Sequence, residues 1–111
     1  MINRNRKLGG YMFTNKDKEM LSNPYFKILT QTPIMYEVQS KNTGNYWVIF
    51  PLQDRRQKYV RLMHKYKKND DYHEQTVTGT VLDAVLEIIS HDDYRLKTKN
   101  PIFEQFVRLY S

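Results

Sequence analysis

The hydrophobic pattern is densest between Asn45 and Leu52, where aromatic and β-branched residues follow one another almost without interruption. Such residues favour strands, so this run predicts the central strand of a sheet. An alternating segment at residues 34–41 precedes it, and Asn42, Thr43 and Gly44 lie between the two. Gly44 suits the positive φ of a tight turn, so we expect the two segments to form a β-hairpin.

The alternation assigns the two faces of this hairpin. If Thr43 and Gly44 alone form the loop, Val38 lies opposite Ile49. The face expected to form the core comprises Tyr36, Val38, Trp47 and Ile49. The other face carries Glu37, Gln39, Lys41, Tyr46, Val48 and Phe50. The central strand is too apolar on this second face to lie in water, so we expect a helix, a partner or a ligand to cover it.

Further strands are expected on both sides of this hairpin. Residues 25–32 are rich in strand formers and end at Pro33, and residues 58–66 alternate after a polar turn. In the latter, Val60, Leu62 and His64 are expected to face the core, together with Tyr66. A short strand is expected at residues 73–77. The sheet therefore has three to five antiparallel strands.

Helical signals lie at both ends of the chain. Thr14 with Asp17 three residues later predicts the N-cap of a short helix that ends at Asn23-Pro24. Thr80 caps a main helix at about 80–90, whose apolar residues recur at helical spacing, and His91-Asp92-Asp93 is expected to end it, since acids are unfavourable at a helix C-terminus. We expect these acids to contact basic residues of the sheet.

The last helix is predicted at about 101–110, because Asn100-Pro101 is a strong start signal. Its wide apolar arc is expected to cover the second face of the sheet, with docking to another chain as the alternative. The fold class that follows is α+β: an antiparallel sheet, a short N-terminal helix, a main helix packed on the sheet and a C-terminal helix.

The length of 111 residues suits one domain, which we place at residues 14–111. Residues 1–13 contain Gly9-Gly10 and three basic residues and are interpreted as a flexible basic arm. Leu8 to Met12 can be encoded by CTA-GGA-GGT-TAT-ATG, which contains a bacterial ribosome-binding sequence before a start codon. Met12 is therefore a candidate for the true start, and a start there lowers the formal net charge by three from +6.

Composition narrows the class of protein. No apolar run approaches the roughly 20 residues of a membrane span, and the N-terminus lacks the apolar core of a signal peptide, so a cytoplasmic protein is expected. There is no cysteine, which excludes disulfides and thiolate chemistry. No cofactor or metal is expected. Richness in Lys, Asn, Tyr and Ile fits an AT-rich bacterial genome, mobile element or phage.

The charge is unevenly distributed along the chain. Residues 1–68 hold 14 Lys/Arg against 4 Asp/Glu, whereas residues 69–111 hold 4 against 8. Such asymmetry is typical of a surface for a polyanion, or of two halves that attract each other within the fold. The basic residues are densest from Arg55 to Lys68, a stretch without an acid.

This basic stretch is the main functional clue, because cations bind phosphates while aromatic rings stack on unpaired bases. The candidate nucleic-acid-binding residues are Arg55, Arg56, Lys58, Tyr59, Arg61, Lys65, Lys67, Lys68 and Trp47. A small noncatalytic nucleic-acid-binding or regulatory accessory protein is the leading hypothesis. A solvated edge strand guarded by lysines is the simpler alternative. The rival function is a protein-interaction module, an inhibitor or adaptor that uses residues 100–111 or the apolar sheet face.

Motifs for catalysis are scarce. The chain has no Gly-rich phosphate loop, no histidine pair at metal-binding spacing and no Gly-x-Ser-x-Gly motif. His64 is expected to lie on the core side or at the sheet edge. A metal-independent nuclease would need His73 and His91 as acid and base. Nothing in their spacing requires this, so no catalytic residue is assigned.

Overall fold

The computed structural model describes residues 11–111. Its elements are α1 (Asn15–Leu21), β1 (Phe26–Thr32), β2 (Met35–Ser40), β3 (Tyr46–Asp54), β4 (Gln57–Lys65), β5 (His73–Thr78), α2 (Val81–Leu96) and α3 (Ile102–Tyr110). The predicted α+β class with its antiparallel sheet and three helices is confirmed. Arg4, Arg6 and Lys7 of the predicted arm, and most of the proposed untranslated segment, lie outside the described residues.

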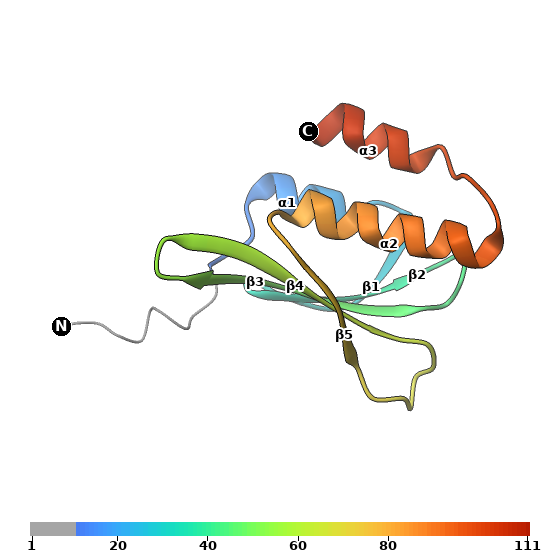
Figure 1. Ribbon diagram of the computed structural model, residues 1–111, viewed down its shortest axis with the longest axis horizontal. Helices are drawn as coiled ribbons and strands as arrows, with labels where there is room; N and C mark the ends of the chain where they lie inside the picture. The colour runs from blue at the N-terminus through green and yellow to red at the C-terminus, as the bar shows by residue number, and fades with distance from the viewer. Residues whose placement is uncertain (1–10) are drawn as a thin grey trace.

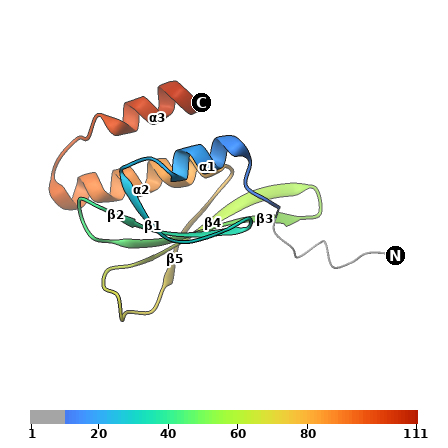
Figure 2. The ribbon, with the colours of Figure 1, turned by 180° about the vertical axis from the view of Figure 1, so that it is seen from behind.

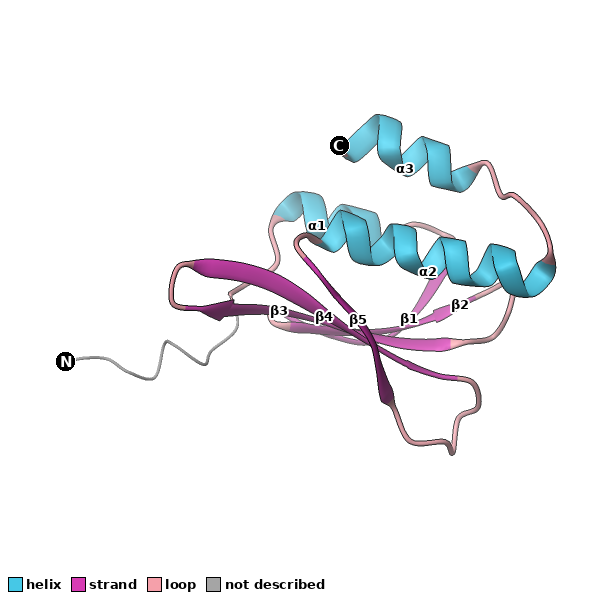
Figure 3. Ribbon diagram, in the orientation of Figure 1, coloured by secondary structure: helices cyan, strands magenta, loops and turns pink. Residues whose placement is uncertain are grey.

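The five strands pair in chain order, β1-β2-β3-β4-β5, and every pairing is antiparallel. The apolar run at residues 45–52 therefore forms the central strand, β3. In Figure 1, α1 and α2 lie on one side of the sheet and α3 lies beyond α2. The molecule thus has three layers, one of strands and two of helices; Figure 3 shows the strands in magenta and all helices in cyan.

The β2-β3 hairpin has the predicted faces but a different register. Tyr36 pairs with Ile49 and Val38 with Trp47, so the predicted pairing of Val38 with Ile49 is wrong by two residues. The cause is a longer loop: the amide of Ser40 donates to the carbonyl of Asn45 at 2.9 Å, and Gly44 adopts φ 79° within the turn. An even shift leaves every side chain on its original face, because strand side chains alternate with period two.

The core lies between the sheet and α2. Tyr36, Val38, Trp47 and Ile49 are fully buried, as are Val60, Leu62 and His64 of β4. Tyr66 is 49% exposed, because β4 ends before it. Phe13, the last residue of the predicted arm, is also buried and contacts Tyr36 edge to face at 4.9 Å. The folded domain therefore includes Phe13.

Helix α2 continues past the predicted end at Ser90 to Leu96, where Lys97 caps it in the left-handed conformation. The prediction failed at Asp92, whose side chain is fully buried rather than paired with basic residues of the sheet. Its carboxylate accepts hydrogen bonds from the Tyr25 hydroxyl at 2.5 Å, the Thr43 hydroxyl at 2.9 Å and the side-chain amide of Asn45 at 3.3 Å. Three donors from the sheet side outweigh the weak unfavourable effect of the helix dipole.

The sequence had suggested that the last helix covers the second face of the sheet, and this prediction is wrong: α3 does not lie there. It packs on α2, and its Phe106 is buried in the main core. The Asn100 side chain accepts a hydrogen bond from the Ile102 amide at 3.0 Å, as expected for a start signal. None of the helices within residues 11–111 has the length and hydrophobicity to cross a membrane.

Candidate nucleic-acid interface

The side of the sheet opposite the helices is the candidate interface. Within residues 11–111 all three helices lie on one side, so no helix covers the other side, which we call the open face (Figure 2). The alternation of core residues along β2, β3 and β4 fixes which side chains project there. The open face of these strands carries Glu37, Gln39, Tyr46, Val48, Phe50, Leu52, Tyr59, Arg61, Met63 and Lys65.

The structure divides the predicted basic residues between the two ends of β4. Arg55 and Arg56 form the exposed β3-β4 turn, which extends beyond the helices in Figure 1, and Arg55 adopts φ 59° there. Lys58 is close by, with its ammonium 5.0 Å from the centre of the Tyr11 ring. We call Arg55, Arg56 and Lys58 the hairpin tip. Lys65 is the last residue of β4, about 26 Å along the strand from Gln57, and Lys67 and Lys68 lie in the loop that follows; we call these three lysines the loop end.

Trp47 is not part of this surface. It is fully buried on the core side of β3, and its indole N–H donates to the Ser40 hydroxyl at 2.9 Å. Its ring cannot stack on a base while the core is intact. The alternation of the strand had already predicted that Trp47 shares the core face with Ile49, and the structure confirms this position. Its selection as a stacking residue rested on its aromatic ring alone.

The loop end is partly engaged within the chain. The Lys65 ammonium donates to the carbonyl of Lys68 at 2.8 Å and lies 4.5 Å from the centre of the Tyr72 ring. The Tyr72 hydroxyl donates to Glu37 at 2.7 Å, and burial, followed by this contact, raises the Tyr72 pKa. Tyr72 therefore links the β4-β5 loop to β2 across this end of the open face. Lys67 and Lys68 remain exposed.

The hairpin tip has a different electrostatic environment. Arg61, in the middle of β4, is paired with Glu74 of β5 at 3.0 Å. Among residues 11–111 this is the one ion pair between a Lys or Arg side chain and a carboxylate within 4 Å. The Arg61–Glu74 pair is thus the one such contact between the basic residues 1–68 and the acidic residues 69–111 in the described chain. Arg55 and Arg56 have no carboxylate partner within the described residues. Their charge is available to an anion.

One residue that the sequence did not select belongs to the open face. Phe50 is partly buried, projects from β3 and pairs in register with Arg61, while Leu52 pairs with Tyr59. Phe50 and Tyr59 are therefore diagonal neighbours on adjacent strands. The parity of Phe50 with Val48 already placed it on the second face, but it lies outside the basic run from which the candidates came.

The three histidines of the chain meet at the far end of β4. His64 is fully buried, and its ring centre lies 4.7 Å from that of His91 and 5.2 Å from that of His73. Neither ring nitrogen of His64 has a hydrogen-bond partner in the described chain. Burial, followed by the nearby His91, His73 and Arg95, lowers the His64 pKa to about 4. His64 is therefore a neutral packing residue at pH 7, and its ring centre lies 4.3 Å from that of Trp47, with the two ring planes tilted by 39°.

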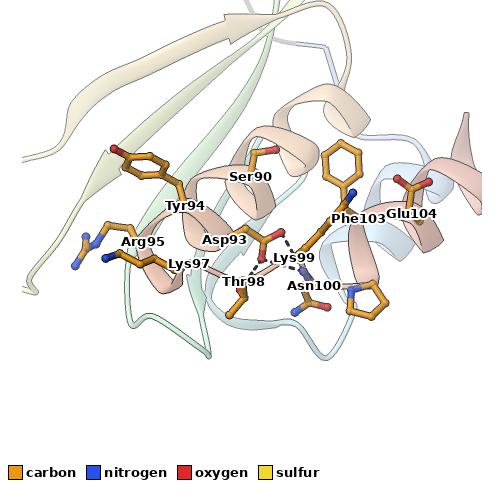
Figure 4. A pocket seen from close by; sticks show the side chains of 11 residues that line it. Ser90, Asp93, Tyr94, Arg95, Lys97, Thr98, Lys99, Asn100, Phe103 and Glu104 are labelled. Atoms are coloured by element: carbon orange, nitrogen blue, oxygen red, sulfur yellow. Dashed lines mark hydrogen bonds between the residues drawn. The ribbon is translucent and has the colours of Figure 1, made fainter.

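The described residues also form a groove between α2 and α3 (Figure 4). Its lining includes Tyr94, which is 85% exposed, and Phe103. Asp93, which also lines the groove, already has hydrogen-bond partners within the chain. Its carboxylate accepts hydrogen bonds from the Thr98 hydroxyl and from the backbone amide of Asn100, each at 3.2 Å. These bonds hold the α2-α3 linker, so the acidic group in this groove has a structural role.

Comparisons of the chain with protein-family models, with curated proteins and with solved structures give no match. No group of three or more His, Cys, Asp or Glu side chains within residues 11–111 is arranged to hold a metal ion. The candidate interface therefore rests on the placement of charge and aromatic rings.

Proposed function

We propose that the protein binds nucleic acid through β4 and its two ends, as a noncatalytic or regulatory accessory protein. The observation that supports this proposal most directly is the hairpin tip. Arg55, Arg56 and Lys58 are exposed on a turn that extends past the helices, without a carboxylate within 4 Å in the described chain. A projecting cationic turn contacts a phosphate backbone without steric interference from the rest of the domain.

The loop end supplies a second set of phosphate contacts on the same strand. Lys67 and Lys68 lie in the loop that follows β4, a strand about 26 Å long, so one nucleic-acid strand along β4 contacts both sets. Arg61 lies between them, and its side chain remains 47% exposed despite the pair with Glu74. In this proposal the bound nucleic-acid strand also contacts Tyr59, Arg61 and Lys65 on the open face of β4. Trp47 makes no contact with it and packs behind β3 in the core.

The test is a titration of fluorescently labelled oligonucleotides at several salt concentrations. Arg55→Gln/Arg56→Gln and Lys67→Gln/Lys68→Gln are each expected to weaken binding to all sequences alike. Each double variant should also reduce the slope of log affinity against log salt by about two, because each phosphate contact contributes about one.

The matched control is Lys16→Gln/Lys18→Gln, which removes the same charge from exposed positions of α1 on the helical side. It is expected to keep the wild-type slope. An equal loss in this control would show that net charge, and not the β4 surface, drives binding. Absence of any binding in about 20 mM salt would overturn the proposal.

A further inference from the structure

Part of the open face is an accessible platform and part is not. Tyr72 reaches from the β4-β5 loop to Glu37 of β2, and this contact crosses the end of the face that holds Tyr46 and Lys65. Val48, which projects from the same end, is only 8% exposed. The half toward the hairpin tip carries no such cover in the described chain, and there Phe50, Leu52, Tyr59 and Arg61 are accessible in part.

This half combines two aromatic rings with cations. Phe50 pairs with Arg61 and Leu52 with Tyr59, so the two rings are diagonal neighbours on β3 and β4, about 7–8 Å apart at their backbones. That spacing matches two successive bases of an extended strand, one over each ring. Arg55 and Arg56 follow in the adjoining turn, where the phosphates beyond those bases would lie.

We infer that the partner is a single-stranded nucleic acid whose bases stack on Phe50 and Tyr59; this inference rests on the proposed function. A duplex hides the faces of its bases and offers this platform only phosphates. Aromatic rings contribute affinity only when bases are unpaired, and they do so with little dependence on sequence. Arg61, beside Phe50 and held by Glu74, presents a planar cation at the same level.

The experiment compares a labelled eight-nucleotide single strand with a duplex of the same sequence, by fluorescence anisotropy. The single strand is expected to bind at least tenfold more tightly. Phe50→Leu and Tyr59→Leu, which keep apolar volume but remove a ring, should each weaken single-strand binding roughly tenfold. The salt slope should stay unchanged, because no charge is altered.

Two controls separate the loss of a ring from a loss of fold. Tyr59→Phe keeps the ring and should bind as the wild type does. Phe103→Leu makes the same change on α3, in the α2-α3 groove, and should leave binding unaffected. Thermal melting of each variant checks that the domain is folded.

The outcomes also separate this inference from the function on which it rests. Equal affinity for duplex and single strand, with no effect of Phe50→Leu and Tyr59→Leu but a normal salt slope, would overturn the stacking inference and leave the β4 proposal standing. Loss of binding to both forms in low salt would remove the β4 proposal as well. A Tyr59→Phe variant as weak as Tyr59→Leu would assign the effect to the hydroxyl and contradict stacking.

Discussion

At the scale of single residues, His64 is the least expected feature of the core. A buried imidazole with both nitrogens unpaired costs free energy even when it is neutral, and a positive charge would cost more, because burial and the neighbouring His91, His73 and Arg95 oppose it. Burial also lowers the His91 pKa. The alternation of β4 predicted that His64 faces inward, but nothing local to it indicated that two further histidines would meet it from β5 and α2.

The His64 environment makes stability depend on pH. The folded-state pKa, about 4, lies below the usual 6.5, so the unfolded chain binds more protons between these values and stability falls as pH decreases through this window. From pH 7 to pH 5 we expect a loss of about 1–2 kcal/mol from this residue. Urea denaturation at both pH values measures it.

His64→Leu should reduce this pH dependence, because it removes the titrating group at similar volume. His73→Gln is the matched comparison, since His73 is exposed, and it should change the dependence little. An unchanged pH dependence in His64→Leu would contradict the assignment.

At the scale of elements, Asp92 explains why α2 is longer than its sequence suggests. By the helix dipole alone, His91-Asp92-Asp93 is unfavourable near a helix C-terminus because two of its residues are acidic. In the fold, Asp92 accepts hydrogen bonds from Tyr25, directly before β1, and from the β2-β3 turn, segments 47 to 67 residues away in sequence. Helix propensity and capping are local, whereas these hydrogen bonds exist only after the sheet and α2 have packed together.

Replacement of Asp92 should therefore destabilise the domain. Asp92→Ala leaves three donors without their acceptor in a buried site, and we expect a loss of about 2–4 kcal/mol in the free energy of unfolding. Chemical denaturation measures this change. Asp83→Ala, an exposed acid in the first turn of the same helix, should cost less than about 1 kcal/mol. Similar losses in the two variants would contradict a stabilising role of the three hydrogen bonds to Asp92.

At the scale of the whole molecule, the basic and acidic parts of the chain form few ion pairs with each other among the described residues. Within residues 11–111, Arg61 and Glu74 form the one close pair between Lys or Arg and a carboxylate, and both are about half exposed. A pair of this kind contributes little to stability. The excess of cations on β4 therefore contributes little to the stability of the fold.

Salt should consequently affect the two properties differently. Between about 0.1 M and 0.5 M salt, we expect the free energy of unfolding to change by less than about 1 kcal/mol, since few charges attract each other in the fold. Nucleic-acid affinity should fall steeply over the same range. Chemical denaturation measures the free energy of unfolding, and anisotropy titrations in the same buffers measure the nucleic-acid affinity. A stability loss above about 2 kcal/mol at high salt would mean that ion pairs hold the domain together.

The sequence by itself determined the class of fold, the central strand, both faces of its hairpin and the caps of α1 and α2, because periodicity and capping act over a few residues. The tertiary structure decided which aromatic rings reach the surface, which acids are buried and which side of the sheet stays open. Parity alone placed Trp47 and Phe50 on opposite faces of β3, and the packing of all three helices on one side then left the Phe50 face open. That choice depends on contacts between distant segments, which no local pattern encodes.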